Sequence, residues 1–188
     1  MNIIEKIKRK YNITLSGEAS DEITSISERK EFSREIILNS GQISRHIYFV
    51  EQGMIRLFYY KDGRDITEHF STENDLIISI ESLFLKEPTR LLIETIEPSV
   101  VYFLDYEKWI KLCNKYTEVS NLYRNMLEAG LVLSQRKADS WRFESSRERY
   151  ERFCREYPEA ARRASVAHIA TYLLMTPETL SRVRAGVL

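Results

Sequence analysis

The chain is poor in the residues that most metal and redox sites require. Its 188 residues include two cysteines and three histidines. Cys113 and Cys154 are far apart, and neither lies in a C-x-x-C pair or a His/Cys cluster. A structural zinc ion or an iron–sulfur cluster therefore has no predicted set of ligands. We interpret both cysteines as buried or incidental thiols, and the scattered histidines His46, His69 and His168 as structural side chains.

Long apolar runs are also absent. No run in the sequence approaches the roughly 18 residues that a membrane-spanning helix needs. The first residues, MNIIEKIKRKYNITL, lack an uninterrupted apolar stretch after their basic residues, so they do not resemble a secretory signal. We therefore expect a cytoplasmic protein with no membrane partner.

Patterns that mark common catalytic sites are missing as well. The sequence has no paired carboxylates, no nucleophile elbow, no metal-ligand cluster and no phosphate-binding loop. We therefore do not expect an enzyme. No metal or cofactor is predicted with certainty, and a small-molecule effector remains open.

The charges balance to zero overall but are unevenly distributed. From Arg136 to the end there are 11 basic and 7 acidic residues, a charge of +4, and the preceding part carries −4. An acidic body with a basic end is expected if only the C-terminal part meets phosphates. The alternative is that the arginines form ion pairs on helix surfaces.

The middle of the chain indicates a β-rich domain. Between about residues 29 and 104, short runs rich in Ile, Val, Phe and Tyr alternate with turn signals, which predicts a small sandwich or roll. The Asp-Gly pair in KDGR predicts a hairpin turn. Before this domain, residues 2–11 and the segment capped by Ser16 predict two peripheral helices.

After Asp105, an expected helix cap, the pattern becomes helical. DYEKWIKLCNKY predicts one amphipathic helix and residues 117–143 a longer one. Apolar residues of the longer helix recur with the 3,4,3,4 spacing of a heptad seam, which predicts a dimerisation helix. Alternatively, the stripe covers the β domain. The seam consists of Val119, Leu122, Met126, Ala129 and Leu133.

The C-terminal segment predicts three further helices. SSRERYERFCREYP begins at a Ser cap, is expected to bury Tyr150, Phe153 and Cys154, and stops before Pro158. Two short helices then flank a turn at residues 174–176, with Thr176 capping the second and Pro177 as its first residue. Inward-facing positions are expected at Val166, Ile169, Ala170 and Leu173 in the first of these helices, and at Leu180 and Val183 in the second.

The segment RYERFCREYPEAARRASVAHIATYLLMTPETLSRVR resembles the C-terminal pattern of the Crp/Fnr superfamily of bacterial transcription regulators, especially its short-tailed branch. TPETLSR is the most specific part, and YFVEQGMIRLFYYKDGRD resembles the hairpin of the family's β-roll. The resemblance implies an α+β fold and a homodimeric regulator that binds a double-stranded DNA operator, with RNA polymerase as a candidate partner. It divides the chain into a double-stranded β-helix or jelly-roll-like domain (1–115), a dimerisation helix (116–143) and a helix-turn-helix domain (144–188).

The resemblance also assigns roles to residues of the second helix. Glu178 would accept from a cytosine amino group, and Arg182 would donate to a guanine edge or a phosphate. The alternative is that these two residues pair on the helix surface. The expected DNA-binding set is Thr176, Pro177, Glu178, Thr179, Ser181, Arg182 and Arg184, in which Thr176 and Ser181 contact phosphate or cap and Arg184 contacts phosphate.

Three departures from the family pattern suggest an alternative function. Leu174 replaces the turn glycine, so we expect the turn to be rebuilt. The β-hairpin that many relatives place before the first helix is not seen, and no C-terminal wing follows Arg184. The alternative is an effector-binding module whose DNA binding is weakened or lost.

The effector pocket also departs from nucleotide-binding relatives. Ile80 stands where they have a glycine, and their Arg-Ser pair aligns with Thr89 and Arg90, which displaces the arginine by one residue. We therefore do not expect cyclic AMP to be the effector. The pocket is expected to bind another small molecule or none. The candidate pocket residues are Glu81, Ser82, Thr89 and Arg90, with a Glu81–Arg90 salt bridge as the alternative. Haem has no defined ligand set, although His46 and His69 stay open as ligands.

Overall fold

Two four-stranded antiparallel sheets form the β domain of the computed structural model, which describes residues 3–187. One sheet has the order β1-β8-β3-β6 and the other β2-β7-β4-β5. Tyr48 and Val101 of the first sheet share a core with Ile55 and Ile93 of the second. The jelly-roll-like α+β fold is therefore confirmed. The strands are β1 Ser27–Phe32, β2 Ile36–Leu38, β3 His46–Gln52, β4 Ile55–Lys61, β5 Arg64–Ser71, β6 Leu76–Ile77, β7 Leu92–Thr95 and β8 Ser99–Asp105.

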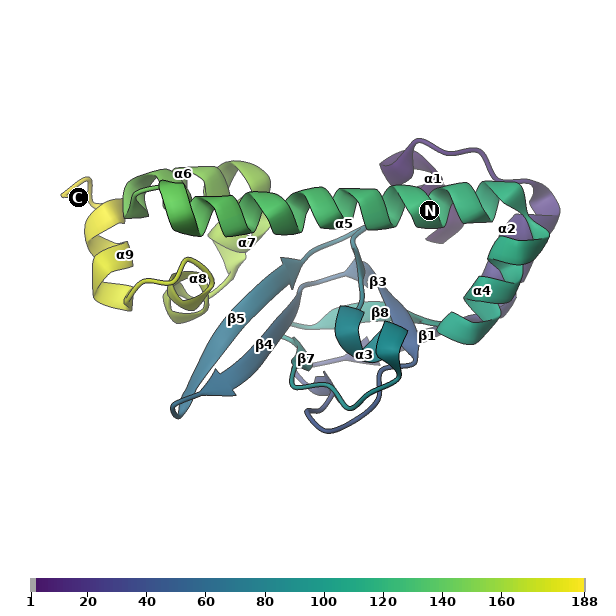
Figure 1. Cartoon of the computed structure of the whole chain (residues 1–188), viewed down its shortest axis with the longest axis horizontal. Coiled ribbons are helices and arrows are strands. Elements are labelled where there is room, and N and C mark those ends of the chain that lie inside the picture. Colours follow the sequence, from purple (N-terminus) through teal and green to yellow (C-terminus); the bar gives the residue numbers. More distant parts are fainter. Residues whose placement is uncertain (1–2, 188) are drawn as a thin grey trace.

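The hairpin predicted at KDGR joins β4 and β5. Lys61 pairs with Arg64, and the two residues between them, Asp62 and Gly63, have φ of 50° and 74°. Two successive positive φ angles are typical of a type I′ turn, which Asp-Gly favours. The hairpin projects beyond the rest of the β domain on the side where the C-terminal helices lie (Figure 1).

Helices cover one end and one side of the β domain. Ser16 and Asp105 cap α2 and α4 through their side-chain oxygens, as predicted. Helix α6 stops before Pro158, as predicted, and Pro158 is the first residue of a further helix, α7, a position that needs no backbone N–H donor. The helices are α1 Ile3–Tyr11, α2 Gly17–Ser25, α3 Ile80–Leu85, α4 Tyr106–Lys115, α5 Thr117–Phe143, α6 Ser146–Glu156, α7 Pro158–Arg163, α8 Val166–Tyr172 and α9 Pro177–Arg184.

The long helix α5 runs along the β domain from α4 to α6 (Figure 1). Val119 and Leu122 are fully buried in a core with α1, α2 and α4, and Met126 packs partly against it. This corrects the predicted seam at Val119 and Leu122, because the first turns of α5 lie against their own domain. Ala129 is exposed and Leu133 is half-buried. The large apolar side chains that α5 exposes along its middle are Leu127, Leu131 and Val132.

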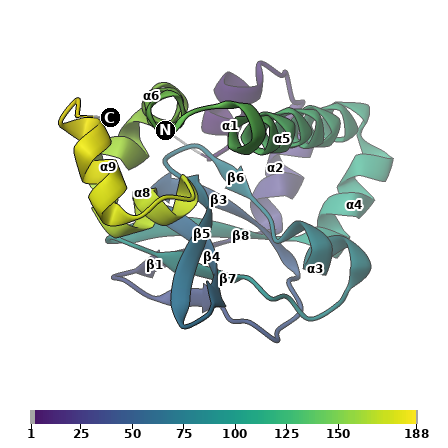
Figure 2. The same cartoon turned by 60° about the vertical axis from the view of Figure 1, so that its left-hand side comes forward.

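Helix α8 packs against β5, and α6, α7 and α9 pack on one another and on α8 (Figure 2). Phe70 of β5 lies 5.9 Å from Phe153 of α6 and 5.6 Å from Tyr172 of α8, measured between ring centroids. Met54 and Ile169 belong to the same core. The predicted inward positions are confirmed at Ile169, Ala170, Leu173, Leu180 and Val183, whereas Val166 is 36% exposed and Tyr150 and Cys154 are half-buried.

The turn between α8 and α9 keeps the left-handed geometry that a glycine would favour. Leu174 has a φ of 53°. Its N–H donates to the Thr171 carbonyl, and the Met175 N–H donates to the Ala170 carbonyl. These two bonds are those of a Schellman motif, with leucine at the position where glycine is usual. The expectation of a rebuilt turn is therefore wrong, and the chain tolerates the strain.

We predict that Gly53→Ala lowers the free energy of unfolding more than Gly63→Ala. Both glycines have positive φ, so each alanine pays about 1–2 kcal/mol for the left-handed conformation. Only at Gly53 would the added Cβ also clash, 2.7 Å from the Pro98 carbonyl oxygen and 2.2 Å from the Ser99 hydroxyl oxygen. Urea titration of the two variants tests this, and equal losses would show that the contact between Gly53 and Ser99 is looser than described.

We predict that Leu174→Val destabilises the protein by about 1 kcal/mol, whereas Leu174→Asn changes the free energy of unfolding by less than about 0.5 kcal/mol. A β-branched side chain is poorly tolerated at positive φ, and asparagine is the common non-glycine residue there. Relief of that strain offsets the apolar contact that Asn loses, since Leu174 is 49% exposed. The reverse order in urea titrations would contradict the left-handed turn.

Candidate DNA-binding and effector sites

The second helix of the C-terminal pair, α9, begins with a well-formed cap. The Thr176 hydroxyl accepts a hydrogen bond from the Thr179 N–H at 3.2 Å, and Pro177 is the first helical residue. Leu180 and Val183 are buried against the module, which fixes the rotation of the helix about its axis. The side chains of the opposite face are therefore held outward. These exposed residues are Thr176, Pro177, Glu178, Ser181, Arg182 and Arg184, while Thr179 is half-buried.

The polar side chains on this exposed face differ in the hydrogen bonds and ion pairs that they already form. Glu178 and Arg182 form no ion pair within residues 3–187, so the surface pair considered as an alternative is not seen. Backbone and Thr176 hydrogen bonds lower the pKa of Glu178. Arg184 donates to the Tyr150 hydroxyl at 3.1 Å and lies over its ring. Arg182 is thus the freer of the two arginines on α9.

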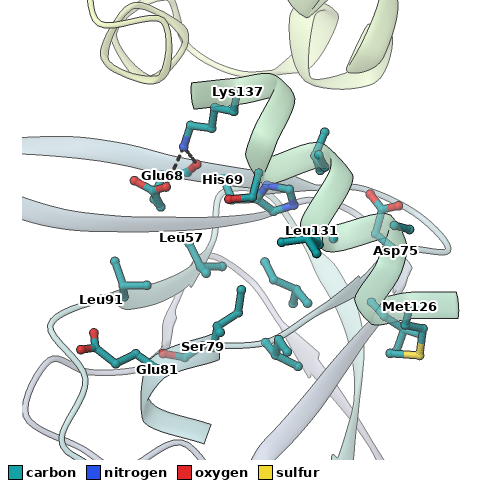
Figure 3. Close-up of a pocket in the computed structure, with 18 of the residues that line it drawn as sticks. Leu57, Glu68, His69, Asp75, Ser79, Glu81, Leu91, Met126, Leu131 and Lys137 are labelled. Carbon is teal, nitrogen blue, oxygen red and sulfur yellow. Dashed lines mark hydrogen bonds and ion pairs between the residues drawn. The ribbon is translucent and has the colours of Figure 1, made fainter. Parts of the chain in front are cut away.

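A cavity of about 1450 Å³ lies between the β domain and α5. It extends from the region around α3 along the helix to the start of α7. In Figure 3, Leu57 and Leu91 lie on the strand side, and Met126 and Leu131 on α5. This volume exceeds the roughly 300–1,000 Å³ of typical ligand pockets. Its side along α5 is lined by exposed residues, so it is an open cavity rather than a closed one.

Three of the four predicted effector residues line this cavity. Glu81, Thr89 and Arg90 border it, but Ser82 does not. The Ser82 hydroxyl instead donates to the Glu87 carbonyl at 2.6 Å and accepts from the Ser44 N–H at 2.9 Å, so it holds the loop after α3. The expected alternative, a Glu81–Arg90 salt bridge, is not seen among the ion pairs of the described residues.

Sequence reasoning missed a buried lysine at the far end of the cavity. Lys137 of α5 is only 9% exposed, and it donates to the Glu68 carboxylate at 2.7 Å and to the Glu68 backbone carbonyl (Figure 3). Burial lowers the pKa of Lys137, and Glu68 opposes that shift. Nothing in the sequence distinguishes this lysine from the exposed arginines Arg124, Arg136 and Arg142 on the same helix. It ties α5 directly to β5.

The two histidines left open as haem ligands lie in different places. Burial lowers the pKa of His69 to about 4, and its ring meets Tyr157 edge to face beside the cavity. His46 packs against Phe103 at the start of β3, outside the cavity lining. The structure therefore does not bring them together. Within residues 3–187, no group of His, Cys, Asp and Glu side chains could hold a metal ion.

Strand β5 contacts the C-terminal module as well as the cavity. The Thr67 hydroxyl and N–H lie 3.1 and 3.2 Å from the Thr171 hydroxyl oxygen of α8. His168 of α8 lies 3.7 Å from Asp65, and burial with the Arg56 charge lowers its pKa to about 4, so the ring is neutral at pH 7. One strand therefore touches the helix-turn-helix through Asp65 and Thr67 and the cavity through Glu68 and His69.

Comparison with known proteins agrees with this architecture. Residues 32–116 match the cyclic nucleotide-binding domain family. No curated protein matches the sequence. Within residues 3–187, no helix is long and apolar enough to cross a membrane.

Three solved structures illustrate the similarity. FixK2 from Bradyrhizobium japonicum is 20% identical with a TM-score of 0.72, over 86% of this chain and 84% of that one. The c-di-GMP-responsive regulator CLP from Xanthomonas campestris is 15% identical with a TM-score of 0.70, over 92% and 91%. The Thermus thermophilus catabolite activator protein is 19% identical with a TM-score of 0.59, over 97% and 86%. Residues 32–116 are thus similar to the cyclic nucleotide-binding domain, and the chain has the fold of the Crp/Fnr regulators that its C-terminal motif predicts.

Proposed function

We propose that the chain is a homodimeric, sequence-specific DNA-binding transcription regulator. The observation that carries this proposal is α9, a capped helix whose first turns present exposed polar side chains while Leu180 and Val183 anchor its other face. A helix held in this way can enter the major groove with Glu178 and Arg182 towards base edges. RNA polymerase is a candidate partner of such a regulator.

The middle of α5 supports the dimer in this proposal. Leu131 is 73% exposed and Val132 50% exposed, an unfavourable state for large apolar side chains on a helix surface. A second copy of α5 laid against this stretch would bury them and would also close the open side of the cavity. A two-fold pair of α9 helices about 34 Å apart would then match one turn of DNA.

We also propose that cyclic AMP is not the effector. The cavity presents the branched side chain of Ile80, 58% exposed, at the start of α3. The hydroxyls of Ser79 and Thr89 lie 3.1 Å apart and hydrogen-bond each other. This bond uses one of the two hydroxyl protons, and both side chains are buried, so at most one hydroxyl is left as a donor for a phosphate.

We predict that Arg182→Ala weakens specific DNA binding by about 5- to 150-fold, which corresponds to the roughly 1–3 kcal/mol of a base-reading contact. DNA selected from a random pool by the wild-type chain would serve as the probe in gel-shift titrations, with a scrambled sequence as competitor. Arg155→Ala is the matched control, because Arg155 is exposed on α6 and forms no ion pair within residues 3–187. If the wild type selects no sequence, the effector-binding module without DNA binding becomes the better function.

We predict that Leu131→Asp converts a dimer to a monomer of 22.2 kDa in sedimentation velocity at micromolar concentration. The charge would be buried without a partner in a helix pair, which is strongly unfavourable. Leu85→Asp is the matched control, since Leu85 is 60% exposed on α3. A wild-type chain that sediments as a monomer, or a Leu131→Asp variant that stays dimeric, would contradict the proposed interface.

A further inference from the structure

The walls of the cavity are apolar along most of its length. Leu57, Ile77 and Leu91 line it from the β domain, and Met126 and Leu131 line it from α5 (Figure 3). These side chains offer no hydrogen bonds to a sugar or a phosphate. The body of a ligand that fills this part of the cavity is therefore apolar.

Several polar groups of the cavity lining already have partners. Thr89 shares its hydroxyl with Ser79 and also accepts a hydrogen bond from the Leu91 N–H at 2.9 Å. At the other end, the Lys137 ammonium is held by Glu68 and the Lys10 ammonium by Asp75. A ligand gains little from these groups unless it displaces an existing partner.

Two cations of the lining remain without an ion pair within residues 3–187. Lys61 lies at the end of the β4–β5 hairpin, and Arg90 lies in the loop that leads into β7. Arg90 is the one that stands beside the apolar walls, one residue before Leu91 and one after the buried Thr89. Its planar guanidinium can bind a carboxylate with two parallel hydrogen bonds.

We propose that the cavity binds a small amphipathic organic acid, with its apolar body between the β domain and α5 and its carboxylate paired with Arg90. This inference rests on the proposed function only in naming the acid as the effector of the regulator. Binding itself requires neither DNA nor an operator. Arg90, the cation next to the apolar walls that is unpaired among the described residues, matches a single anionic group on an apolar chain or ring.

Isothermal titration of the full-length wild-type chain with octanoate, 1-octanol and cyclic AMP tests the proposal. Octanoate should bind at least about tenfold more tightly than octanol, because a charge-assisted pair with Arg90 contributes roughly that factor. Shortening the acid to hexanoate should weaken binding by about fourfold per methylene that leaves the apolar wall. Cyclic AMP should neither bind comparably nor displace octanoate.

Arg90→Gln is the decisive variant, since Arg90 is exposed and forms no ion pair in the described chain, so the fold does not depend on it. It should weaken octanoate binding about tenfold and leave octanol unchanged. Arg45→Gln is the matched control, because Arg45 is also exposed but does not line the cavity. It should change neither affinity.

Three outcomes would overturn the proposal: no measurable binding of octanoate, equal affinity for octanoate and octanol in the wild type, or loss of octanoate binding in Lys61→Gln but not in Arg90→Gln. Gel shifts of the same preparations with the selected DNA keep this result separate from the proposed function. If octanoate does not bind while specific DNA binding persists, the ligand class is wrong and the regulator stands. If octanoate binds a chain that selects no DNA, the ligand class is right and the proposed DNA-binding function is wrong.

Discussion

The burial of Phe70 between the aromatic rings of Phe153 and Tyr172 is the contact on which the arrangement of the chain depends. Phe70 lies on β5, so a strand of the β domain supplies part of the core of the C-terminal module. Without it, helices as short as α7, α8 and α9 would have little apolar surface to bury, and short helices are not stable alone. The module is therefore held in one orientation relative to the β domain.

Ion pairs around this core help to fix the orientation of the C-terminal helices relative to the β domain. The Arg163 guanidinium of α7 pairs with Glu73 at 2.7 Å and with Glu97 at 2.8 Å, in two separate loops of the β domain. Arg56 of β4, almost fully buried, bonds Asp65 of β5 and Glu94 of β7 at 2.6 Å. A buried guanidinium tolerates few geometries, since each displaced carboxylate leaves charge unpaired. The ion pairs of Arg56 and Arg163 therefore contribute more to the orientation of the segments they join than to the free energy of unfolding.

Features that depend on neighbouring residues in the sequence, such as helix caps, could be predicted. Features that depend on which distant segment packs against a residue could not. Ser16, Asp105 and Thr176 cap their helices because each bonds an N–H three residues away, a relation that the sequence contains in full. The apolar stripe of α5 is different. Periodicity shows that a face is buried but not by what, and Val119 and Leu122 turned out to meet their own domain.

The candidate sites also contain residues that could be predicted from the sequence and residues that could not. The exposed face of α9 follows from helical periodicity and from the cap, so its residues could be assigned from the sequence. Lys137 could not, because its burial depends on Glu68, a residue of a distant strand whose position only the folded hairpin defines. Likewise, the place of Ser82 outside the cavity follows from its bonds to Glu87 and Ser44, which are set by the loop.

The position of β5 gives the cavity a physical route to the helix-turn-helix. Glu68 and His69 line the cavity, while Asp65 and Thr67 of the same strand contact α8. A ligand that moves the strand must therefore repack the contacts of Thr67 with Thr171, and a module reoriented on DNA must move the strand in return. Because binding free energies are linked, a ligand that changes DNA affinity by a given factor has its own affinity changed by DNA by that same factor. In the proposed regulator, β5 thus contacts both the candidate effector cavity and the candidate DNA-binding helices.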